Sequence, residues 1–512
     1  MQDTLIRVGD GYCIVDGPYP DTLLKKLKYW RRSLEWDEHL FRRVATGRYE
    51  ELYTSQPYLD DKQQYCPKLM TMPGFAYKIK QCMTEARMPF KMIDERTPMP
   101  KPNIEKALTG LRDYQLEPIY KCIMSGGGIF SAPTGWGKGR VFASIAKAFD
   151  PLDLKARNTP LTVIATASKD ITAKNFKEMK ELLPDREIGL VMTGYKEFSD
   201  DIQVITLDSL HLLNPDEVGI LIVDEVHVAA SDSRSENLLT MRRAARWGVS
   251  ATPTGRFDGK DLVTEGILGP VIHESTYGDA VKAGALVPIT VYWITCPEPP
   301  MGIDKYLSYS SRAGKYRWGV YRNQARNQLI ADLLRRFPQD MQCLAIMQFL
   351  EQMEYIKQCC DENVEIVHAE TDEKKICDHK HLRAISPRER KEIYSRMETA
   401  EIKRILSTHV YSTGVNFPQL EVVINAGGGG SDIVSKQIPG RESRKTADKS
   451  RSYLIDFWHP WDQERNKETG RLRNGPIHAD DNAREKVYTE LEFEQVWIQQ
   501  IDQIPLIRNS LP

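Results

Sequence analysis

Short apolar runs alternate with longer amphipathic stretches through the middle of the chain. Apolar runs occupy residues 161–167 (LTVIATA), 202–207 (IQVITL) and 219–225 (GILIVDE), and residues 139–149 (GRVFASIAKAF) have helical spacing. Short runs rich in β-branched residues, separated by helices, are typical of a parallel sheet with crossover helices. The pattern predicts an α/β domain.

A second series of the same kind follows. Its apolar runs lie within residues 341–360, 404–410, 420–427 and 452–458, and they predict a second α/β domain in tandem with the first. Near the end of the chain, residues 482–501 (NAREKVYTELEFEQVWIQQI) predict a helix that packs back on this second domain.

The first hundred residues have a different texture. Three prolines interrupt residues 96–110 (RTPMPKPNIEKALTG), which indicates a linker after a separate, smaller α+β module. Within this module, residues 20–36 (PDTLLKKLKYWRRSLEW) predict an amphipathic helix. It carries basic and aromatic residues side by side: Lys25, Lys26, Lys28, Arg31, Arg32, Tyr29, Trp30 and Trp36. Such a helix suits phosphates and exposed bases, and it equally suits a solvated basic face over an aromatic core.

Composition and charge set outer bounds. A chain of 512 residues has room for about three domains, and we expect an accessory module (1–105), two α/β domains (106–288 and 289–460) and a C-terminal helical extension (461–512). The 70 basic and 71 acidic residues nearly cancel, so any nucleic-acid site is a local groove. The nine cysteines form no disulfide-like framework, and neither a leader pattern nor an apolar run of about 18 residues is present. We therefore expect a cytoplasmic protein without a membrane segment.

One loop contains most of a phosphate-binding motif. The usual motif is G-x-x-x-x-G-K-[ST], whereas in residues 131–140 (SAPTGWGKGR) Ala132 begins the frame and Gly139 replaces the hydroxyl residue. Lys138 would supply a positive charge for the β- and γ-phosphates, and the following helix would point its N-terminus at them. By itself the loop also fits a glycine-rich turn that merely joins a strand to a helix.

An acidic pair strengthens the phosphate interpretation. The apolar run at 219–225 ends in Asp224 and Glu225, which places two carboxylates at the carboxyl edge of the predicted sheet, where nucleotides bind in α/β folds. Asp224 suits Mg²⁺, and Glu225 suits orienting and deprotonating a water molecule. An isolated Asp-Glu pair is commonly a solvated turn, but this pair shares a domain with Lys138.

Six motifs occur in the order of the superfamily 2 helicase motifs: residues 111–115 (LRDYQ), 132–139 (APTGWGKG), 224–227 (DEVH), 250–256 (SATPTGR), 412–418 (STGVNFP) and 437–444 (QIPGRESR). Residues 106–460 therefore resemble these helicases, and are most similar to phage-type fork-remodelling and branch-migration DNA helicases and to related repair and restriction translocases. Gln437 at the start of the last motif resembles that group, whereas DEAD-box RNA helicases usually have histidine there.

The resemblance implies two tandem RecA-like parallel-sheet domains, an α/β fold class, and a site for ATP and Mg²⁺. It implies these catalytic residues: Lys138, Asp224 (also the Mg²⁺ ligand), Glu225, His227, Gln437, Arg441 and Arg444. It implies these ATP contacts: Arg112, Gln115, Pro133, Thr134, Gly135, Trp136, Gly137, Lys138, Gly139 and Gly414. It assigns coupling to Ser250 and Thr252, and contacts with the nucleic-acid backbone to Ser168, Lys169, Ser209 and Thr408.

Some of these roles agree with elementary chemistry. An amide such as that of Gln115 can both donate to and accept from an adenine edge. Arg441 and Arg444 would act as arginine fingers that neutralise charge on the γ-phosphoryl group, although surface arginines also form ordinary ion pairs. Ser168 and Ser209 could equally be helix caps. The hydroxyl missing at Gly139 could be replaced by a water molecule held by Asp224 and the phosphates.

We therefore expect an active ATP-dependent DNA helicase or translocase in the cytoplasm of a bacterium or a phage-infected host. It would act on single-stranded, duplex or branched DNA with little sequence preference. Two alternatives remain at this point. One is a nucleotide-sensing DNA-binding subunit with slow ATPase activity that serves a nuclease or repair partner, and the other is an RNA helicase.

A further group of residues offers soft ligands for zinc: Cys359, Cys360, His368, Cys377, His379 and His381. Their spacing matches none of the usual C-x₂-C patterns. The pattern favours a helix end, a strand and a solvated loop.

Overall fold

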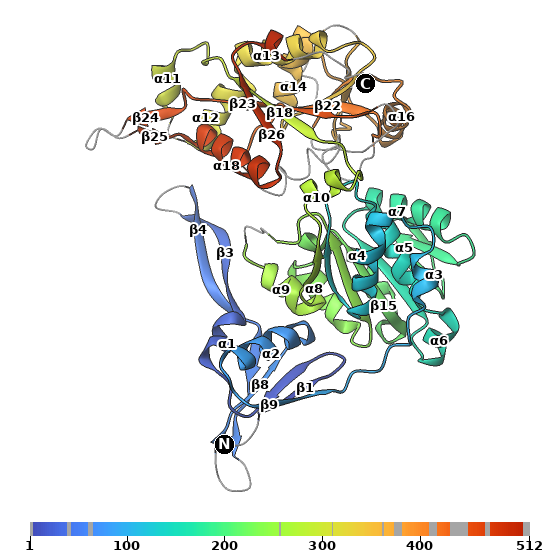
Figure 1. Ribbon diagram of the computed structural model, residues 1–512. Coiled ribbons are helices and arrows are strands. Elements are labelled where there is room, and N and C mark those ends of the chain that lie inside the picture. Colours follow the sequence, from blue (N-terminus) through green and yellow to red (C-terminus); the bar gives the residue numbers. More distant parts are fainter. Residues whose placement is uncertain are drawn as a thin grey trace. The chain divides into compact units, whose positions relative to one another are not determined.

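The computed structural model describes residues 4–37, 42–59, 65–254, 258–309, 311–360, 363–372, 381–408, 417–430, 449–465 and 472–504 (Figure 1). The chain divides into two compact units, one made of residues 1–133 and 137–275 and the other of residues 134–136 and 276–512. Each unit contains a large, mainly parallel sheet with helices, and the first also contains the small N-terminal module. The predicted α/β class with tandem parallel-sheet domains is confirmed.

The N-terminal module is built on a five-stranded sheet in the order β5-β8-β2-β1-β9. Its elements are β1 (Thr4–Val8), β2 (Cys13–Asp16), α1 (Asp21–Lys26), β5 (Tyr53–Ser55), β6 (Tyr58–Leu59), β7 (Tyr65–Cys66), β8 (Lys68–Thr71), α2 (Ala76–Glu85) and β9 (Phe90–Asp94). Alternate residues of β1 are buried, as expected for a strand with one face on a core. That core is the module's own: Leu69, Phe75 and Ile79 are fully buried in it.

The predicted helix over residues 20–36 is wrong beyond its first turns. The helix α1 ends at Lys26, and β3 (Lys28–Asp37) then pairs antiparallel with β4 (Arg42–Glu51) in a ribbon that extends from the small sheet in Figure 1. From Tyr29 to Ser33 the side chains alternate between half-buried and exposed. This is the two-residue period of a strand, and aromatic residues favour strands.

The first large sheet has the strand order β13-β12-β14-β11-β15-β16-β10-β17, in which only β13 pairs antiparallel. Its strands are β10 (Gly128–Ser131), β11 (Leu161–Thr166), β12 (Ile188–Met192), β13 (Tyr195–Glu197), β14 (Ile202–Thr206), β15 (Val218–Asp224), β16 (Ala245–Ser250) and β17 (Val271–Glu274). Every residue of β11 and β15 is buried, because helices cover both faces of the sheet. This explains the continuous apolar runs in the sequence.

The helices of this domain are α3 (Ile104–Leu108), α4 (Asp113–Met124), α5 (Lys138–Ala148), α6 (Pro151–Ala156), α7 (Lys169–Leu182), α8 (Asp232–Thr240) and α9 (Asp261–Leu268). In Figure 1, α5 and α7 lie together on one side of the sheet, and α8 and α9 lie on the other. Ser131 of β10 is in register with Ser250 of β16, and Val249 is in register with Asp224 of β15. The carboxyl ends of these three strands therefore meet at one edge.

The second unit has a seven-stranded sheet in the order β20-β21-β19-β22-β23-β18-β26. Its strands are β18 (Ile289–Thr295), β19 (Gln342–Ile346), β20 (Glu365–Val367), β21 (Arg404–Ser407), β22 (Leu420–Asn425), β23 (Ser452–Trp458) and β26 (Glu494–Ile498), with a separate pair β24 (Gln463–Arg465) and β25 (Leu472–Asn474). Its helices are α10 (Tyr277–Lys282), α11 (Ile303–Leu307), α12 (Arg312–Tyr316), α13 (Gln324–Arg336), α14 (Leu350–Cys359), α16 (Pro387–Glu398) and α18 (Pro476–Glu490).

The end of the described chain differs from the single helix predicted over residues 482–501. The helix α18 stops at Glu490, and β26 then joins the sheet parallel to β18. Residues 494–498 contain Val496, Trp497 and Ile498, whose side chains favour a strand. The second half of that prediction is therefore wrong.

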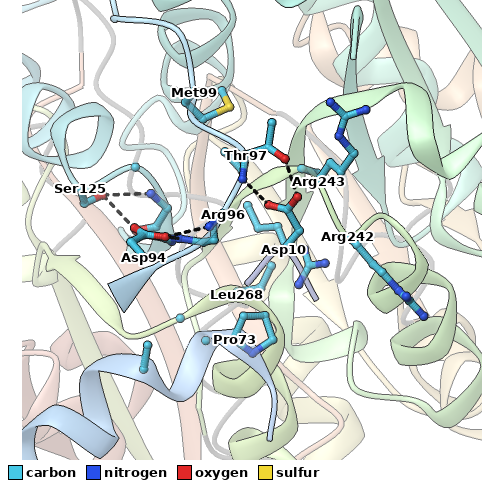
Figure 2. Close-up of a pocket in the computed structure, with 18 of the residues that line it drawn as sticks. Asp10, Pro73, Asp94, Arg96, Thr97, Met99, Ser125, Arg242, Arg243 and Leu268 are labelled. Carbon is cyan, nitrogen blue, oxygen red and sulfur yellow. Dashed lines mark hydrogen bonds and ion pairs between the residues drawn. The ribbon is translucent and has the colours of Figure 1, made fainter. Parts of the chain in front are cut away.

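The proline-rich linker contacts both the N-terminal module and the first α/β domain. The Asp10 carboxylate accepts hydrogen bonds from the Thr97 backbone N–H (2.8 Å) and hydroxyl (2.5 Å), and Arg157 donates to the Thr97 carbonyl at 2.9 Å. Figure 2 shows Asp10 and Thr97 beside Arg242 and Arg243 in the lining of a pocket of about 510 Å³. The linker thus attaches the N-terminal module to the first α/β domain through polar contacts.

Candidate functional site

The glycine-rich loop joins β10 to α5, as the sequence predicts. Gly135 and Gly137 have φ values of 88° and 100°, in the left-handed region that glycine adopts readily. Among the described residues no side chain caps the start of α5, so its first N–H groups face outward from the helix end as they do in anion sites. The predicted residues Pro133, Thr134 and Trp136 lie in the turn between the two elements.

Lys138 and the acidic pair meet at the carboxyl edge of the sheet. Lys138 is the first residue of α5, and its Nζ lies 3.6 Å from Oε1 of Glu225. Asp224 is the last residue of β15 and is only 7% exposed. Only β16 lies between β15 and β10, the strand that leads into the loop with Lys138. The loop and the acidic pair, far apart in the sequence, therefore become neighbours.

Asp224 is buried, and its described hydrogen bonds come from neutral donors. Its Oδ2 accepts a hydrogen bond from the Asn175 side-chain amide at 2.9 Å, and its Oδ1 accepts one from the Glu225 backbone N–H at 3.0 Å. Burial, reinforced by the neighbouring charge of Glu225, raises the pKa of Asp224 to about 6 even though Lys138 acts in the opposite direction. A buried oxygen ligand whose pKa is raised in this way favours a cation beside it.

Glu225 connects the site to the next strand. Its Oε2 accepts a hydrogen bond from the Ser250 hydroxyl at 3.1 Å and lies 3.5 Å from Nδ1 of His227. The backbone N–H of Thr252 in turn donates to the Ser250 hydroxyl at 3.1 Å. Glu225 itself has φ 54°, a strained conformation for a residue other than glycine. A movement of the Glu225 carboxylate would therefore disturb the hydrogen bonds of Ser250 and Thr252, at and after the end of β16.

The predicted adenine contact packs directly against the loop. Gln115 is fully buried, and its Oε1 accepts a hydrogen bond from the Arg112 backbone N–H at 3.1 Å, which caps α4. Its Nε2 lies 2.7 Å from the place where a Cβ on Gly137 would stand. The Arg112 guanidinium donates to the Tyr114 hydroxyl at 3.2 Å. The glycine thus allows α4 and the loop to approach closely.

Two family models match successive parts of the chain. The model for the res subunit of type III restriction enzymes matches residues 108–255, and the model for the helicase conserved C-terminal domain matches residues 325–446. The chain belongs to the superfamily 2 helicases. It is thus an ATP-hydrolysing enzyme of a family that contains helicases and DNA translocases, and the resemblance inferred from its motifs is confirmed.

Individual proteins agree with this family. The helicase is 25% identical to "Putative helicase 22" of Sulfolobus islandicus filamentous virus over 84% of this chain and 77% of the viral protein. It is 29% identical to the DNA 3'-5' translocase XPB2 of Sulfurisphaera tokodaii, over 32% of this chain and 36% of that protein. Its fold matches the DNA-bound type ISP restriction-modification enzyme LlaBIII at 13% identity, with a TM-score of 0.51 over 83% of this chain and 34% of the enzyme.

The predicted nucleic-acid contacts have mixed surroundings in the helicase. Ser168 caps α7, accepting from the Ile171 N–H at 3.4 Å, and exposed Lys169 begins that helix. Ser209 is buried and accepts a hydrogen bond from the Thr206 hydroxyl at 2.8 Å. Thr408 follows β21, and its backbone N–H donates to the Val367 carbonyl at 3.1 Å. Four residues predicted for ATP binding or catalysis lie outside the described residues: Gly414, Gln437, Arg441 and Arg444.

Helix α7 supplies residues to the site that sequence reasoning missed. Asn175 reaches Asp224, the charge of Lys174 acts on the same carboxylate, and Glu178 lies against Gly139. Their three- and four-residue spacing places them on one helix face. The sequence around these three residues has only the pattern of an ordinary amphipathic helix. The packing of α7 on α5 is what identifies them as residues of the site.

Two other questions raised by the sequence concern a zinc site and a membrane segment. Among the described residues no three His, Cys, Asp or Glu side chains are grouped so as to hold a metal, and Cys377 and His379 of the zinc hypothesis fall outside those residues. None of the described helices combines the length and apolar composition needed to cross a lipid bilayer.

Proposed function

We propose that this helicase binds ATP with Mg²⁺ at the edge formed by Lys138, Asp224 and Glu225, and that it uses hydrolysis to move along DNA. The observation that supports the proposal is the convergence of a lysine at a helix N-terminus with two carboxylates at the end of β15. This arrangement has the parts that phosphoryl transfer to water requires: a cradle, a metal ligand and a base.

The residues fit a magnesium ion. Mg²⁺ prefers oxygen ligands and is usually held by one or two carboxylates together with substrate phosphates, not by a complete protein cage. Asp224 offers such a carboxylate, buried and bonded only to neutral donors among the contacts described above. When bound, the ion would neutralise charge on the phosphates, and Asp224 would hold it there.

Lys138 and Glu225 divide the remaining work. The long Lys138 side chain can leave Glu225 for the β- and γ-phosphates, since its Nζ is 3.6 Å from that carboxylate and only the side chain must turn. Glu225 then accepts a proton from water as the water oxygen bonds to the γ-phosphorus and the bond to the ADP oxygen breaks. Ser250 and His227 keep Glu225 oriented and relay its state.

The second domain completes the proposal. Arg441 and Arg444 would neutralise charge on the γ-phosphoryl group, and Gln437 of the same motif would be a further catalytic residue, as the family resemblance implies. Gln115 would contact adenine. Each cycle of binding and hydrolysis would change the spacing of the two domains and so move the enzyme along the DNA backbone.

The ATP site can be tested with Lys138→Ala and Lys155→Ala. Lys155 is an exposed lysine of α6 and serves as the matched control. We expect Lys138→Ala to lose DNA-stimulated phosphate release and most affinity for a labelled ATP analogue, because the phosphates lose their fixed positive charge. Lys155→Ala should keep both. Wild-type turnover in a folded Lys138→Ala protein would contradict the proposal.

The N-terminal ribbon supports a contact with DNA. Trp30 and Tyr49 are 45% and 64% exposed, with ring centres 4.9 Å apart, and Lys28 Nζ lies 5.3 Å from the Tyr49 ring centre. The Arg31 guanidinium binds Asp232 of the first α/β domain at 2.9 Å, and Lys260 binds the same carboxylate. Exposed aromatic rings beside basic groups form stacking platforms for unpaired bases. We propose that the ribbon contacts forked or branched DNA.

This contact predicts a loss of affinity in Trp30→Ala and Tyr49→Ala. Stacking of one base on an aromatic ring contributes about 1–3 kcal/mol, so each variant should bind labelled forked DNA about tenfold more weakly. Tyr195, 46% exposed on the edge strand β13, provides Tyr195→Ala as the control. Equal anisotropy titrations for all four proteins would leave the ribbon as a structural brace.

A further inference from the structure

The glycine at the hydroxyl position of the phosphate-binding loop faces a carboxylate from another helix. A Cβ placed on Gly139 would lie 2.0 Å from Oε1 and 2.3 Å from Cδ of Glu178. Two atoms that are not bonded cannot approach so closely. The carboxylate of Glu178 therefore occupies the space into which a serine or threonine side chain would project from position 139.

Glu178 reaches this place from the face of α7 that already serves the site. Asn175, three residues earlier on the helix, donates to Oδ2 of Asp224 at 2.9 Å. Residues three apart on a helix share a face, so Asn175 and Glu178 point toward the same edge of the sheet. Gly139 directly follows Lys138, and α5 packs on α7. Glu178 is half-buried there, against Gly139 of the loop.

The charge of Glu178 distinguishes it from the residue it would replace. A hydroxyl is neutral and can lie beside phosphates without penalty, whereas a carboxylate repels them unless a cation lies between. Mg²⁺ accepts carboxylate oxygens and takes the rest of its ligands from phosphates and water. A carboxylate in this position is thus compatible with nucleotide binding only when it shares a cation with the nucleotide.

We propose that Glu178 takes over the task of the missing hydroxyl and, together with Asp224, holds the Mg²⁺ that accompanies ATP, directly or through a water molecule. This inference rests on the proposed ATP site. Gly139 then has a function of its own, because a side chain at this position would force the Glu178 carboxylate out of its present place. A serine introduced at position 139 alone would displace the carboxylate instead of improving the metal site.

The first test measures binding and not turnover. The affinity of a non-hydrolysable ATP analogue is followed as Mg²⁺ is titrated, in the wild type, in Glu178→Gln and in Glu181→Gln. Glu181 is an exposed glutamate one turn further along α7 and is the matched control. Loss of a group that supports a metal commonly weakens metal binding by about 10- to 100-fold, so Glu178→Gln should need that much more Mg²⁺ for half-maximal binding. Glu181→Gln should follow the wild type.

The second test exchanges the two groups. Gly139→Ser should also raise the Mg²⁺ requirement, and Gly139→Ser combined with Glu178→Ala should bring it back toward the wild type, because the hydroxyl then has room. A Glu178→Gln protein that titrates like the wild type overturns the inference, and so does a Gly139→Ser protein with a lowered Mg²⁺ requirement. Thermal unfolding of each variant establishes that it is folded.

The two proposals fail in different ways. If the wild type binds no analogue in saturating Mg²⁺, or Lys138→Ala binds it equally well, the ATP site itself is wrong. If the wild type binds the analogue through Lys138 while Glu178→Gln is indistinguishable from it at every Mg²⁺ concentration, only the assignment of Glu178 is wrong.

Discussion

Both large sheets bury an aspartate near the carboxyl end of a strand, yet the two aspartates have opposite surroundings. Asp456 in β23 is fully buried and accepts hydrogen bonds from Arg484 Nε (2.9 Å), the Tyr488 hydroxyl (2.9 Å) and the Asn425 amide (3.0 Å). Asp224 in β15 has the neutral amide of Asn175. The hydrogen bonds of Asp456 include one from a charged guanidinium, whereas those described for Asp224 come from a neutral amide and a backbone N–H.

In the second unit Asp456 is part of a larger group of paired buried charges, which we call the closed network. Arg484 Nη2 also donates to Asp481 at 2.9 Å, and His459 Nδ1 lies 3.0 Å from the same carboxylate. Burial alone would raise the pKa of Asp481, but the His459 charge and hydrogen bond hold it well below its usual range. By contrast, burial raises the pKa of Asp224 to about 6. Matched buried charges maintain a fold, whereas a buried carboxylate at a sheet edge whose pKa is raised by burial and by a neighbouring carboxylate is typical of a ligand site.

We call the edge that carries Lys138, Asp224 and Glu225 the open site. The largest effect is expected when this site loses its base, Glu225. Glu225→Gln keeps the volume and the hydrogen bond from Ser250 but cannot accept a proton. General-base catalysis contributes about 10²- to 10⁴-fold, so DNA-stimulated phosphate release should fall by that factor while binding of an ATP analogue is retained. Steady-state assays with and without forked DNA measure the first, and fluorescence titration the second. Turnover at the wild-type rate would remove Glu225 from the mechanism.

Removing a charge from each network should have opposite effects on stability. Arg484→Met leaves Asp456 and Asp481 buried without their guanidinium, and breaking a buried ion pair on one side costs about 3–5 kcal/mol. Asp224→Asn removes a charge whose burial outweighs the effect of the nearby Lys138 and Lys174 charges, so stability should stay the same or rise. Urea unfolding followed by circular dichroism measures both changes.

The ATPase activity of the two variants, Arg484→Met and Asp224→Asn, gives a second measurement beside their stability. Asp224→Asn should lose DNA-stimulated ATPase activity although it folds at least as well as the wild type, which separates function from stability at this position. If Arg484→Met were as stable as the wild type, or Asp224→Asn were strongly destabilised, the contrast between the closed and open networks would be wrong.

The open site was largely predictable because its signals are local. Lys138 between glycines, ahead of a helical pattern, and Asp224 at the end of an apolar run each carry their chemistry in a few consecutive residues. Parallel-sheet topology then brings such strand ends together without further information. Only the family resemblance assigns Ser250 to coupling, and in the structure its hydroxyl donates a hydrogen bond to Glu225.

The features that were missed depend on tertiary packing. Residues 28–37 combine aromatic and basic side chains that fit a helix as well as a strand, and pairing with residues 42–51 decides between them. Glu178 acquires meaning only from the missing side chain of Gly139. Arg484 and Asp456 are distant in the sequence and carry no motif, so their pairing could not be inferred from the residues alone.

The smallest expected effect is a pH dependence of the closed network. Burial works against a charged His459, but the Asp481 carboxylate outweighs it and raises the pKa of His459 to about 9. A histidine whose pKa is higher in the folded state than its unfolded value of about 6.5 adds stability that is fully present below pH 6.5 and is lost as the pH rises through 9. His459→Gln should therefore be less stable than the wild type at pH 6, on the order of 1–3 kcal/mol, and the difference should shrink toward pH 9.5. Asp224, with its pKa of about 6, also titrates at the lower end of this window, but it is present in both proteins and therefore cancels from the difference between them. Urea unfolding of both proteins at several pH values measures the difference, and a gap that stays constant from pH 6 to 9.5 would show that His459 is held by packing and not by its charge.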